Sequence, residues 1–343
     1  MTVTIKDVAR EAKLAVSTIS KYMNGGKVRP KNEQIIKEVV ERLGYRPNNF
    51  ARGLRNSRSY TIALLTPNME GEHSARMISS LEDQVKKMGC FLNICCYQDS
   101  IEHIKSYVEY LTEKNVDGII VSPIKTTEDY LEPARRAGIP IVILEDTYGI
   151  ENCDVLQVDC ASASYQIVEH LIQQGHRKIA VIKGTEGMTT SRERLNGYLR
   201  VMEDYGYPVK EEFLIDGDYD YRSGYEGVMK LWQLGERPTA LFVTNYHMSV
   251  GALVAINRLH IRVPEELSVV VYDDMTLSTI VRPRLTAVHQ PLEELMEKAC
   301  ELIEKRMNGD FEGFPGKWRL KARIAYRDSV GKPQTESKRL ESA

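Results

Sequence analysis

Apolar residues near the start of the chain recur at helical spacing in two short segments, which a tight turn separates. In residues 5–12 they fall on one face, and Thr4 precedes Asp7 by the three residues of a capping box. Residues 13–15 break this phase, and residues 16–23 resume it. The pattern therefore predicts a pair of short helices.

The second of these helices is expected to bury Leu14, Ile19 and Met23 and to expose short polar groups. Its outward positions hold Val16, Ser17, Thr18 and Lys21. A helix with short polar groups and a cation on its N-terminal half is typical of helices that read bases in the major groove. Any two amphipathic helices share this pattern, so the segment alone leaves a purely structural helix pair open.

A third helix is predicted over about residues 32–43, where apolar residues again share one face, and Gly44 suits the residue that ends it. Residues 49–56 have the length of a helix but are too few for a stable helix in water. At Thr61 the pattern of apolar and polar residues changes.

From Thr61 onward, strongly apolar runs of strand length alternate with helical patterns such as 75–88 and 163–174. Nearly continuous apolar strands are typical of parallel sheets that helices cover on both faces. The strands are too many for one comfortable sheet, which predicts a doubly wound α/β architecture with two sheets and a cleft between them. Residues 331–343 are polar and are expected to be a disordered tail. The predicted strands are 62–66, 91–96, 118–122, 139–144, 155–158, 179–183, 240–244 and 269–272.

Charge is distributed unevenly along the chain, although the formal net charge is only −2. Residues 1–60 contain 13 Lys and Arg against 5 Asp and Glu, a balance of +8; the remainder contains 33 against 43, a balance of −10. A basic head on an acidic body suits a head that meets phosphates and a body that does not. The alternative is a helical head that is merely well solvated.

The N-terminus has no apolar signal core, and no apolar run is long enough to span a membrane, which predicts a cytoplasmic protein. The six cysteines include no Cys-x-x-Cys pair, so they indicate neither a zinc site nor a disulfide framework. They are expected to be core thiols, and no metal or other cofactor is expected.

Eight motifs then occur in a fixed order. They are TIKDVA at 4–9, LGYRPN at 43–48, ARGL at 51–54, HLIQQGHRKIA at 170–180, RLNGY at 194–198, PTALFVTN at 238–245, SVVVYDD at 268–274 and VRPRLTAVHQP at 281–291. Together they make the chain resemble the LacI/GalR family of bacterial transcription regulators over about residues 4–329.

The resemblance implies a small all-α helix-turn-helix domain followed by a two-subdomain, doubly wound α/β core that is similar to periplasmic binding proteins. It also implies a homodimer that binds double-stranded, near-palindromic operator DNA and a small-molecule effector, a sugar or sugar derivative. The expected parts are a helix-turn-helix domain (1–47), a hinge helix and linker (48–59), and a core (60–330) whose N-subdomain is 60–160 plus 292–319 and whose C-subdomain is 161–291 plus 320–330.

Val16, Ser17 and Lys21 match the positions with which the family reads bases, and Lys21 suits guanine O6 or N7. Ala15 stands where the family usually has Ser, so the reading helix lacks its expected N-cap, and Ser17 offers a cap farther inward. Leu54 matches the leucine that the family inserts into the minor groove; alternatively it packs only on the partner's hinge. The DNA contacts implied are Thr4, Val16, Ser17, Thr18, Lys21, Asn24, Arg29, Asn48, Ala51 and Leu54.

Four residues of the cleft match effector-binding positions of the family. Asp273, which follows the run 269–272, matches the carboxylate that takes sugar hydroxyls, and Arg194 matches the arginine that pairs with it across the effector. Asn245 adds an amide, and Tyr219 matches a ring that stacks on the sugar. Buried hydroxyls need both donors and acceptors, which this set supplies. The alternatives are an Asp–Arg pair and a tyrosine that only stabilise the fold.

The chain also departs from the family pattern in the cleft. Tyr246 follows Asn245 where the family has Asp, and the stretch 70–74 (EGEHS) replaces the usual aromatic pair. One wall of the cleft becomes more polar and acidic, which favours a larger, more hydroxylated or partly cationic effector. Glu72 and His73 are further candidate effector ligands, although an isolated loop histidine is more often only solvated.

Two rival functions have little support in the sequence. Asp273 and Asp274 at a strand end could act as catalytic carboxylates, but no GxSxG, HExxH or glycine-rich phosphate loop accompanies them. A secreted sugar-binding protein would need a signal peptide and would leave the basic head without a purpose.

A third rival lies within the regulators. The segment LSTIVRP at 277–283 resembles catabolite-control proteins, which a serine-phosphorylated phosphocarrier protein activates. A phosphoserine partner needs an Arg or Lys face, whereas residues 291–306 contain five glutamates against two lysines and one arginine. A small-molecule effector is therefore preferred.

Overall fold

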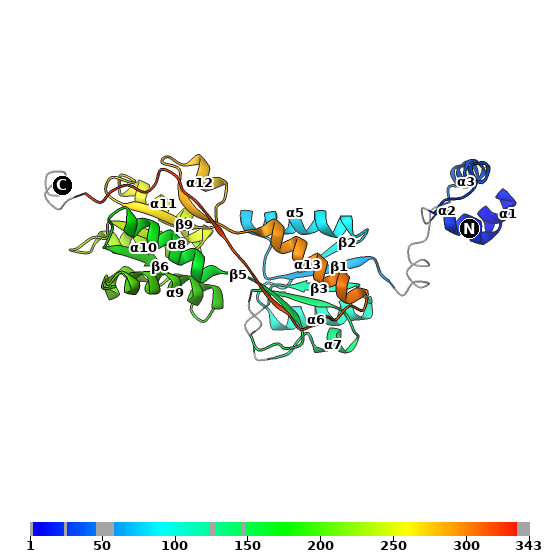
Figure 1. The fold of residues 1–343 in the computed structure, drawn as a ribbon, viewed down its shortest axis with the longest axis horizontal. Coiled ribbons are helices and arrows are strands. Elements are labelled where there is room, and N and C mark those ends of the chain that lie inside the picture. Colours follow the sequence, from blue (N-terminus) through cyan, green and yellow to red (C-terminus); the bar gives the residue numbers. More distant parts are fainter. Residues whose placement is uncertain are drawn as a thin grey trace. The chain divides into compact units, whose positions relative to one another are not determined.

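The structure is a computed structural model that describes residues 3–23, 26–45, 58–123, 126, 128–145 and 148–334. The chain forms two compact units, Met1–Tyr60 and Thr61–Ala343 (Figure 1). Within the described ranges, no helix is both long and apolar enough to cross a membrane. The predicted hinge segment at 49–56 and the predicted DNA contacts Asn24, Asn48, Ala51 and Leu54 lie outside these ranges.

The first unit contains three helices around a small apolar core: α1 (Ile5–Ala12), α2 (Val16–Met23) and α3 (Pro30–Leu43). The capping box is confirmed, because the Asp7 amide donates to Thr4 and the Thr4 amide donates to Asp7. The prediction that Gly44 ends the third helix is also confirmed, with a left-handed φ of 61°. That helix begins earlier than predicted, because Pro30 occupies its first turn, where the missing amide has no cost.

The predicted inward cap of the reading helix is wrong. α2 begins at Val16, and the carbonyl of Ala15 accepts the amides of Thr18 and Ile19. Ala15 is therefore the N-cap residue although its side chain cannot cap, and Ser17 lies within the first helical turn.

The second unit contains two six-stranded sheets, which define an N-subdomain and a C-subdomain. The N-subdomain sheet has the order β11-β5-β4-β3-β1-β2 and is parallel throughout. Its strands are β1 (Thr61–Thr66), β2 (Phe91–Cys96), β3 (Gly118–Val121), β4 (Ile141–Leu144), β5 (Asp154–Val158) and β11 (Lys317–Leu320), and its helices are α5 (Gly71–Lys87), α6 (Ile101–Glu113), α7 (Glu132–Arg136) and α13 (Leu292–Met307).

The C-subdomain sheet has the order β12-β10-β9-β8-β6-β7, in which only β12 is antiparallel to its neighbour. Its strands are β6 (Ile179–Ile182), β7 (Leu214–Ile215), β8 (Ala240–Val243), β9 (Ser268–Tyr272), β10 (Thr286–His289) and β12 (Arg323–Ala325), and its helices are α8 (Cys160–Gln173), α9 (Thr189–Asp204), a 3-10 turn (Glu211–Phe213), α10 (Tyr221–Trp232), α11 (Tyr246–Arg258) and α12 (Thr276–Ile280).

Successive strand residues face opposite helical layers, which explains the continuous apolar runs of the sequence. In β1, Leu64 packs beneath α5 and α13, whereas Leu65 packs against α6 and α7. In β8, Phe242 faces α8 and α9, whereas Leu241 faces α10 and α11. The predicted doubly wound α/β class with two sheets is thus confirmed.

The chain crosses between the two subdomains three times (Figure 1). The crossings lie between β5 and α8, between β10 and α13, and between β11 and β12. Each subdomain therefore contains segments from distant parts of the sequence.

The apolar pattern missed four strands, β7, β10, β11 and β12, which have only two to four residues each. It also placed the start of β5 one residue late, because Asp154 is charged. Asp154 is fully buried and pairs with Arg306, so an ion pair replaces an apolar side chain there. The first residue of the expected tail at 331–343 packs on the core, because Nε2 of His176 lies 2.8 Å from the carbonyl oxygen of Gly331.

Candidate functional site

The face of α2 that the sequence assigns to DNA is open to solvent. Val16, Ser17 and Lys21 are exposed, and Thr18 is half-buried, while Ile19 on the opposite face is fully buried. Val16 is 43% exposed, so its side chain is accessible to a partner on this face. The carbonyl of Lys21 accepts the amide of Gly26, which fixes the helix end while its ammonium stays in solvent.

Two further predicted DNA contacts in this unit differ in how free their side chains are. The Thr4 hydroxyl donates to Asp7 at 2.6 Å, so this side chain already has a structural role in the capping box. Arg29 precedes α3 as its N-cap residue, and its exposed side chain makes no capping bond. Arg29 is therefore available for a phosphate, whereas the amide, carbonyl and hydroxyl of Thr4 are already used in the capping box.

A cavity of about 150 Å³ lies between the two subdomains of the second unit. The N-subdomain contributes most of its lining, from the C-terminal ends of strands β1, β3 and β4 and from α5 and α13, while α8 and α9 contribute the opposite wall. Its polar lining residues are Thr66, Asn68, His73, Ser74, Ser122, Glu145, Gln157, Thr189, Thr190, Glu193 and Gln290. Ligands of open α/β folds bind at this end of the strands.

Asp273 stands directly behind this cavity. Its Oδ2 accepts the backbone amide of Tyr246 at 3.1 Å, and its Oδ1 accepts Nε2 of Gln290 at 2.5 Å. Gln290 lines the cavity and belongs to the crossing between β10 and α13. The carboxylate is thus held by the C-subdomain on one side and by a crossing segment on the other.

Arg194 is a buried cation with spare donors. One terminal nitrogen donates to the carbonyl of Thr244 at 2.6 Å, and the guanidinium lies 3.7 Å from the ring centre of Tyr272. Its Nε has no hydrogen-bond partner among the described residues. Arg194 interacts electrostatically with Asp273, but no ion pair within 4.0 Å joins them in the described part of the chain. Burial raises the pKa of the neighbouring Cys160, a cavity-lining thiol that therefore stays neutral.

Tyr219 and Asn245 also lie on the C-subdomain side. The Tyr219 hydroxyl is 3.4 Å from that of Thr190, which lines the cavity. Asn245 is the N-cap of α11, since its Oδ1 accepts the amide of Met248 at 2.9 Å. The structure therefore brings the four predicted effector residues together. They form a second layer behind the residues that line the cavity.

Glu72 and His73 separate, although they are adjacent in sequence. His73 lines the cavity, whereas Glu72 does not and instead contacts Thr276 of the C-subdomain. Partial burial raises the pKa of Glu72, but hydrogen bonds from Thr276 and Arg76 outweigh this and leave the pKa below the ordinary 4.5. Glu72 is thus ionised and bridges the two subdomains.

Glu145, which was not predicted from the sequence, lines the cavity immediately after β4. Glu145, Tyr219 and Asp273 have φ values of 71°, 54° and 74°, although none is glycine. Such strained residues cluster at functional sites, where the surrounding fold holds them. The sequence signal was available, because Glu145 ends a strand at the edge where ligands bind.

The stretch 70–74, expected to make one wall acidic, contributes only His73 and Ser74 to the cavity. The described lining of the cavity includes two carboxylates, Glu145 and Glu193, and no lysine or arginine. Its volume, however, is below the roughly 300–1,000 Å³ of pockets for larger ligands. The expected larger effector therefore does not fit this arrangement of the subdomains.

Comparison with known proteins places these features in a family. Residues 4–48 match the model of bacterial regulatory proteins of the lacI family, and residues 168–330 match a periplasmic binding protein-like domain. Catabolite control protein A of Priestia megaterium is 34% identical over 313 residues, covering 90% of this chain and 93% of the relative. The HTH-type transcriptional repressor PurR of Haemophilus influenzae strain PittEE is 32% identical over 312 residues, covering 90% and 93%.

Solved structures agree with this assignment. A complex of the transcriptional regulator CelR with cellobiose has a TM-score of 0.72 and 26% identity, covering 95% of this chain and 99% of that one. The lac repressor dimer bound to operator and the anti-inducer ONPF has a TM-score of 0.82 at 24% identity, covering 96% and 100%, which supports the fold. The helix-turn-helix unit, the two-lobed core and these similarities together establish that the chain belongs to the lacI family of bacterial regulatory proteins.

Proposed function

We propose that the protein is a sequence-specific transcriptional regulator, a repressor of carbohydrate-utilisation genes whose operator binding a small sugar-like effector controls. The observation that carries this proposal is that one chain joins an exposed reading helix to a core with a polar cavity between two subdomains. The protein acts where its DNA lies, in the bacterial cytoplasm.

The DNA-binding part rests on α2. Exposed Ser17 and Lys21 offer hydrogen bonds to base edges, and exposed Val16 offers an apolar contact for a thymine methyl group. The protein binds operators as a homodimer, so that two reading helices meet two half-sites of a near-palindrome. The lac repressor, which shares the fold, is described as a dimer on its operator.

The effector part rests on the chemistry of the cavity. Glu145 accepts hydrogen bonds, Glu193 can still do so through the oxygen that Arg319 does not contact, and Asn68 and Gln157 offer amides that both donate and accept. Behind them, Arg194 has an unsatisfied Nε, which an effector oxygen would satisfy. A neutral or amino-substituted polyol of monosaccharide size fits this set best, and a phosphorylated sugar fits it poorly because the carboxylates repel it. CelR, whose complex contains the disaccharide cellobiose, binds a larger ligand than this cavity holds.

Replacing Lys21 with alanine is expected to relax base preference at one position in each half-site, because a single good base contact contributes about 1–3 kcal/mol. The operator is first recovered by selecting DNA from a random library with the wild-type protein. Binding of single-base variants is then measured by fluorescence anisotropy for both proteins.

Lys37→Ala is the matched control, since Lys37 is an exposed lysine on α3, away from the reading face. It should lower affinity for all sequences equally or leave it unchanged. A uniform loss with Lys21→Ala would instead make Lys21 a phosphate contact and remove it from base reading.

Neutral sugars are expected to bind at least about tenfold more tightly than their phosphates, because Glu145 lines the described cavity wall, no lysine or arginine does, and the nearby Arg319 is already paired with Glu193. Calorimetry compares D-glucose with glucose 6-phosphate, D-ribose with ribose 5-phosphate, and D-glucosamine with glucosamine 6-phosphate. Tighter binding of any phosphate would overturn this effector class without affecting the DNA-binding proposal.

A second candidate function has one observation in its favour, the 34% identity to catabolite control protein A. In that function a serine-phosphorylated phosphocarrier protein replaces or assists the effector. The structure supplies little cationic surface on α13 for a phosphoserine: Arg306 is buried, Lys298 pairs with Glu301, and all five glutamates of the helix are exposed. Calorimetric titration with the serine-phosphorylated and the unphosphorylated phosphocarrier protein from a related bacterium distinguishes the two candidates. Binding of the phosphorylated form alone would favour the second candidate.

A further inference from the structure

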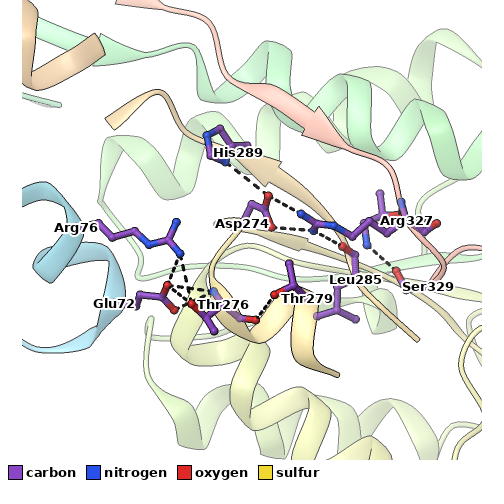
Figure 2. A network of polar contacts seen from close by, with 10 residues as sticks. Glu72, Arg76, Asp274, Thr276, Thr279, Leu285, His289, Arg327 and Ser329 are labelled. Carbon is purple, nitrogen blue, oxygen red and sulfur yellow. Dashed lines mark hydrogen bonds and ion pairs between the residues drawn. The ribbon is translucent and has the colours of Figure 1, made fainter. Parts of the chain in front are cut away.

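Glu72 connects the two subdomains through several hydrogen bonds to a single residue. The backbone amide of Thr276 donates to both carboxylate oxygens, at 2.9 and 3.1 Å, and its hydroxyl donates at 2.6 Å. Arg76, one turn farther along α5, donates to the same carboxylate and lies 3.4 Å from the Thr276 hydroxyl. Figure 2 shows that these groups converge at the junction of α5 with the segment before α12.

This contact completes the N-terminus of α12, which its own subdomain leaves uncapped. Met275 occupies the N-cap position and makes no side-chain capping bond. A carboxylate stabilises a helix start by accepting its free amides and by opposing its dipole. Glu72 therefore caps a helix of the C-subdomain from the N-subdomain.

The capped residue is only three positions from Asp273, which stands behind the effector cavity. Between them, Asp274 forms two hydrogen bonds with Arg327, at 2.7 and 2.8 Å, and lies 3.6 Å from His289 (Figure 2). Met275 is buried. Because both intermediate residues are fixed, Thr276 and Asp273 belong to one short, firmly held segment that joins the contact with the N-subdomain to the cavity.

We propose that Glu72 is a positioning residue that couples the effector cavity to the arrangement of the subdomains. This inference rests on the proposed function. The bond to Thr276 stabilises the closed arrangement, in which both subdomains line the cavity, and it does so before an effector binds. Effector and Glu72 thus favour the same arrangement, so that removing Glu72 acts in the direction opposite to adding effector.

The test uses the full-length protein and its selected operator. Glu72→Ala is expected to change operator affinity, in the absence of sugar, in the direction opposite to that caused by the effector. It should also weaken the effector by about three- to tenfold, because the competent arrangement is less populated. Operator affinity is measured with no sugar and with each of D-glucose, D-galactose, D-ribose and D-glucosamine. Amide exchange of residues 274–280 should become faster in the variant without any sugar.

Glu82→Gln removes the same charge from an exposed position of the same helix and should behave as wild type. Thr276→Ser keeps both donors and should retain coupling, whereas Thr276→Val removes only the hydroxyl. Combined with Glu72→Ala, Thr276→Val should have little additional effect, because the two side chains act as one unit.

The outcomes separate this inference from the proposed function. If no sugar changes operator binding by the wild-type protein, the effector proposal fails. If a sugar acts on the wild type and acts equally on Glu72→Ala, with unchanged exchange at 274–280, the positioning role is wrong. A loss of thermal stability in Glu72→Ala without any change in coupling would likewise make the contact merely structural.

Discussion

Replacing Arg306 with methionine is expected to destabilise the N-subdomain by about 3–5 kcal/mol, the usual cost of leaving one member of a buried ion pair alone. Asp154 is fully buried, and the Arg306 side chain is 2% exposed. Nε of Arg306 donates to Asp154 at 2.8 Å, and a second nitrogen donates at 3.1 Å. Among the described residues, the substitution would leave the Asp154 carboxylate with only the amide of Gly316, at 2.9 Å.

The same guanidinium holds the loop that leads into β11. It donates to the carbonyls of Asp310 and Glu312, at 2.7 and 3.2 Å. Because β11 forms an edge of the sheet next to β5, loss of this loop is expected to loosen that edge first.

Trp318 in β11 and Trp232 in α10 are the two tryptophans of the chain, so a Trp232→Phe background makes Trp318 a reporter of the N-subdomain. Urea unfolding followed by its fluorescence measures the loss. Lys305→Ala is the control, because Lys305 is exposed and directly precedes Arg306; it should change the free energy of unfolding by less than about 0.5 kcal/mol. Adding Asp154→Asn to Arg306→Met should recover part of the loss, because no buried charge then remains. A cost below about 1 kcal/mol for Arg306→Met would contradict the assigned role.

Replacing Asp273 with asparagine is expected to weaken the effector about 10- to 100-fold and to leave operator affinity without effector nearly unchanged. The charge-assisted hydrogen bonds of a carboxylate contribute about 1.5–3 kcal/mol, which corresponds to this range. Asparagine is chosen because Asp273 has a φ of 74°, a conformation that asparagine tolerates and alanine does not. Its side-chain oxygen can still accept the amide of Tyr246.

Calorimetry with the active sugar, together with operator binding in its presence and absence, measures both effects. Asp216→Asn makes the same chemical change at a side chain that is 92% exposed and should leave both affinities unaltered. An unchanged sugar affinity in Asp273→Asn would show that the effector is held by the cavity-lining residues alone, with Asp273 serving only to hold Gln290.

Periodicity predicted the fold well because most of the predicted strands are nearly continuous apolar runs that are covered on both faces. It failed where another interaction replaced apolar burial. Asp154 begins a strand through an ion pair with a residue 152 positions away, and β11 alternates exposed and half-buried side chains at a sheet edge. The hydrophobic pattern of such strands is too weak to distinguish them from loops in a single sequence.

The candidate site was only partly predictable for a related reason. Arg194, Tyr219, Asn245 and Asp273 were predicted from the family resemblance and lie together. Gln290 and Thr190, which stand between them and the cavity, were not predicted, although Gln290 belongs to the motif at 281–291. Glu72 was predicted to contact the effector because residues 70–74 replace the family's aromatic pair in the cleft, yet its partner is Thr276, 204 residues later in the chain. Only the docking of one subdomain on the other creates that contact.

The pairing of β11 with β5 and of β12 with β10 has a consequence for synthesis on the ribosome. Both strands come from residues 317–325, and each completes the edge of a different sheet. Neither sheet can therefore be completed before residues 317–325 have been synthesised, however early its other strands emerge. A message cut short before this stretch yields a DNA-reading head on a core with two open sheet edges, which invites aggregation and degradation rather than partial regulation. Only a chain that has been synthesised through residue 325 can complete both sheets and so form the whole core.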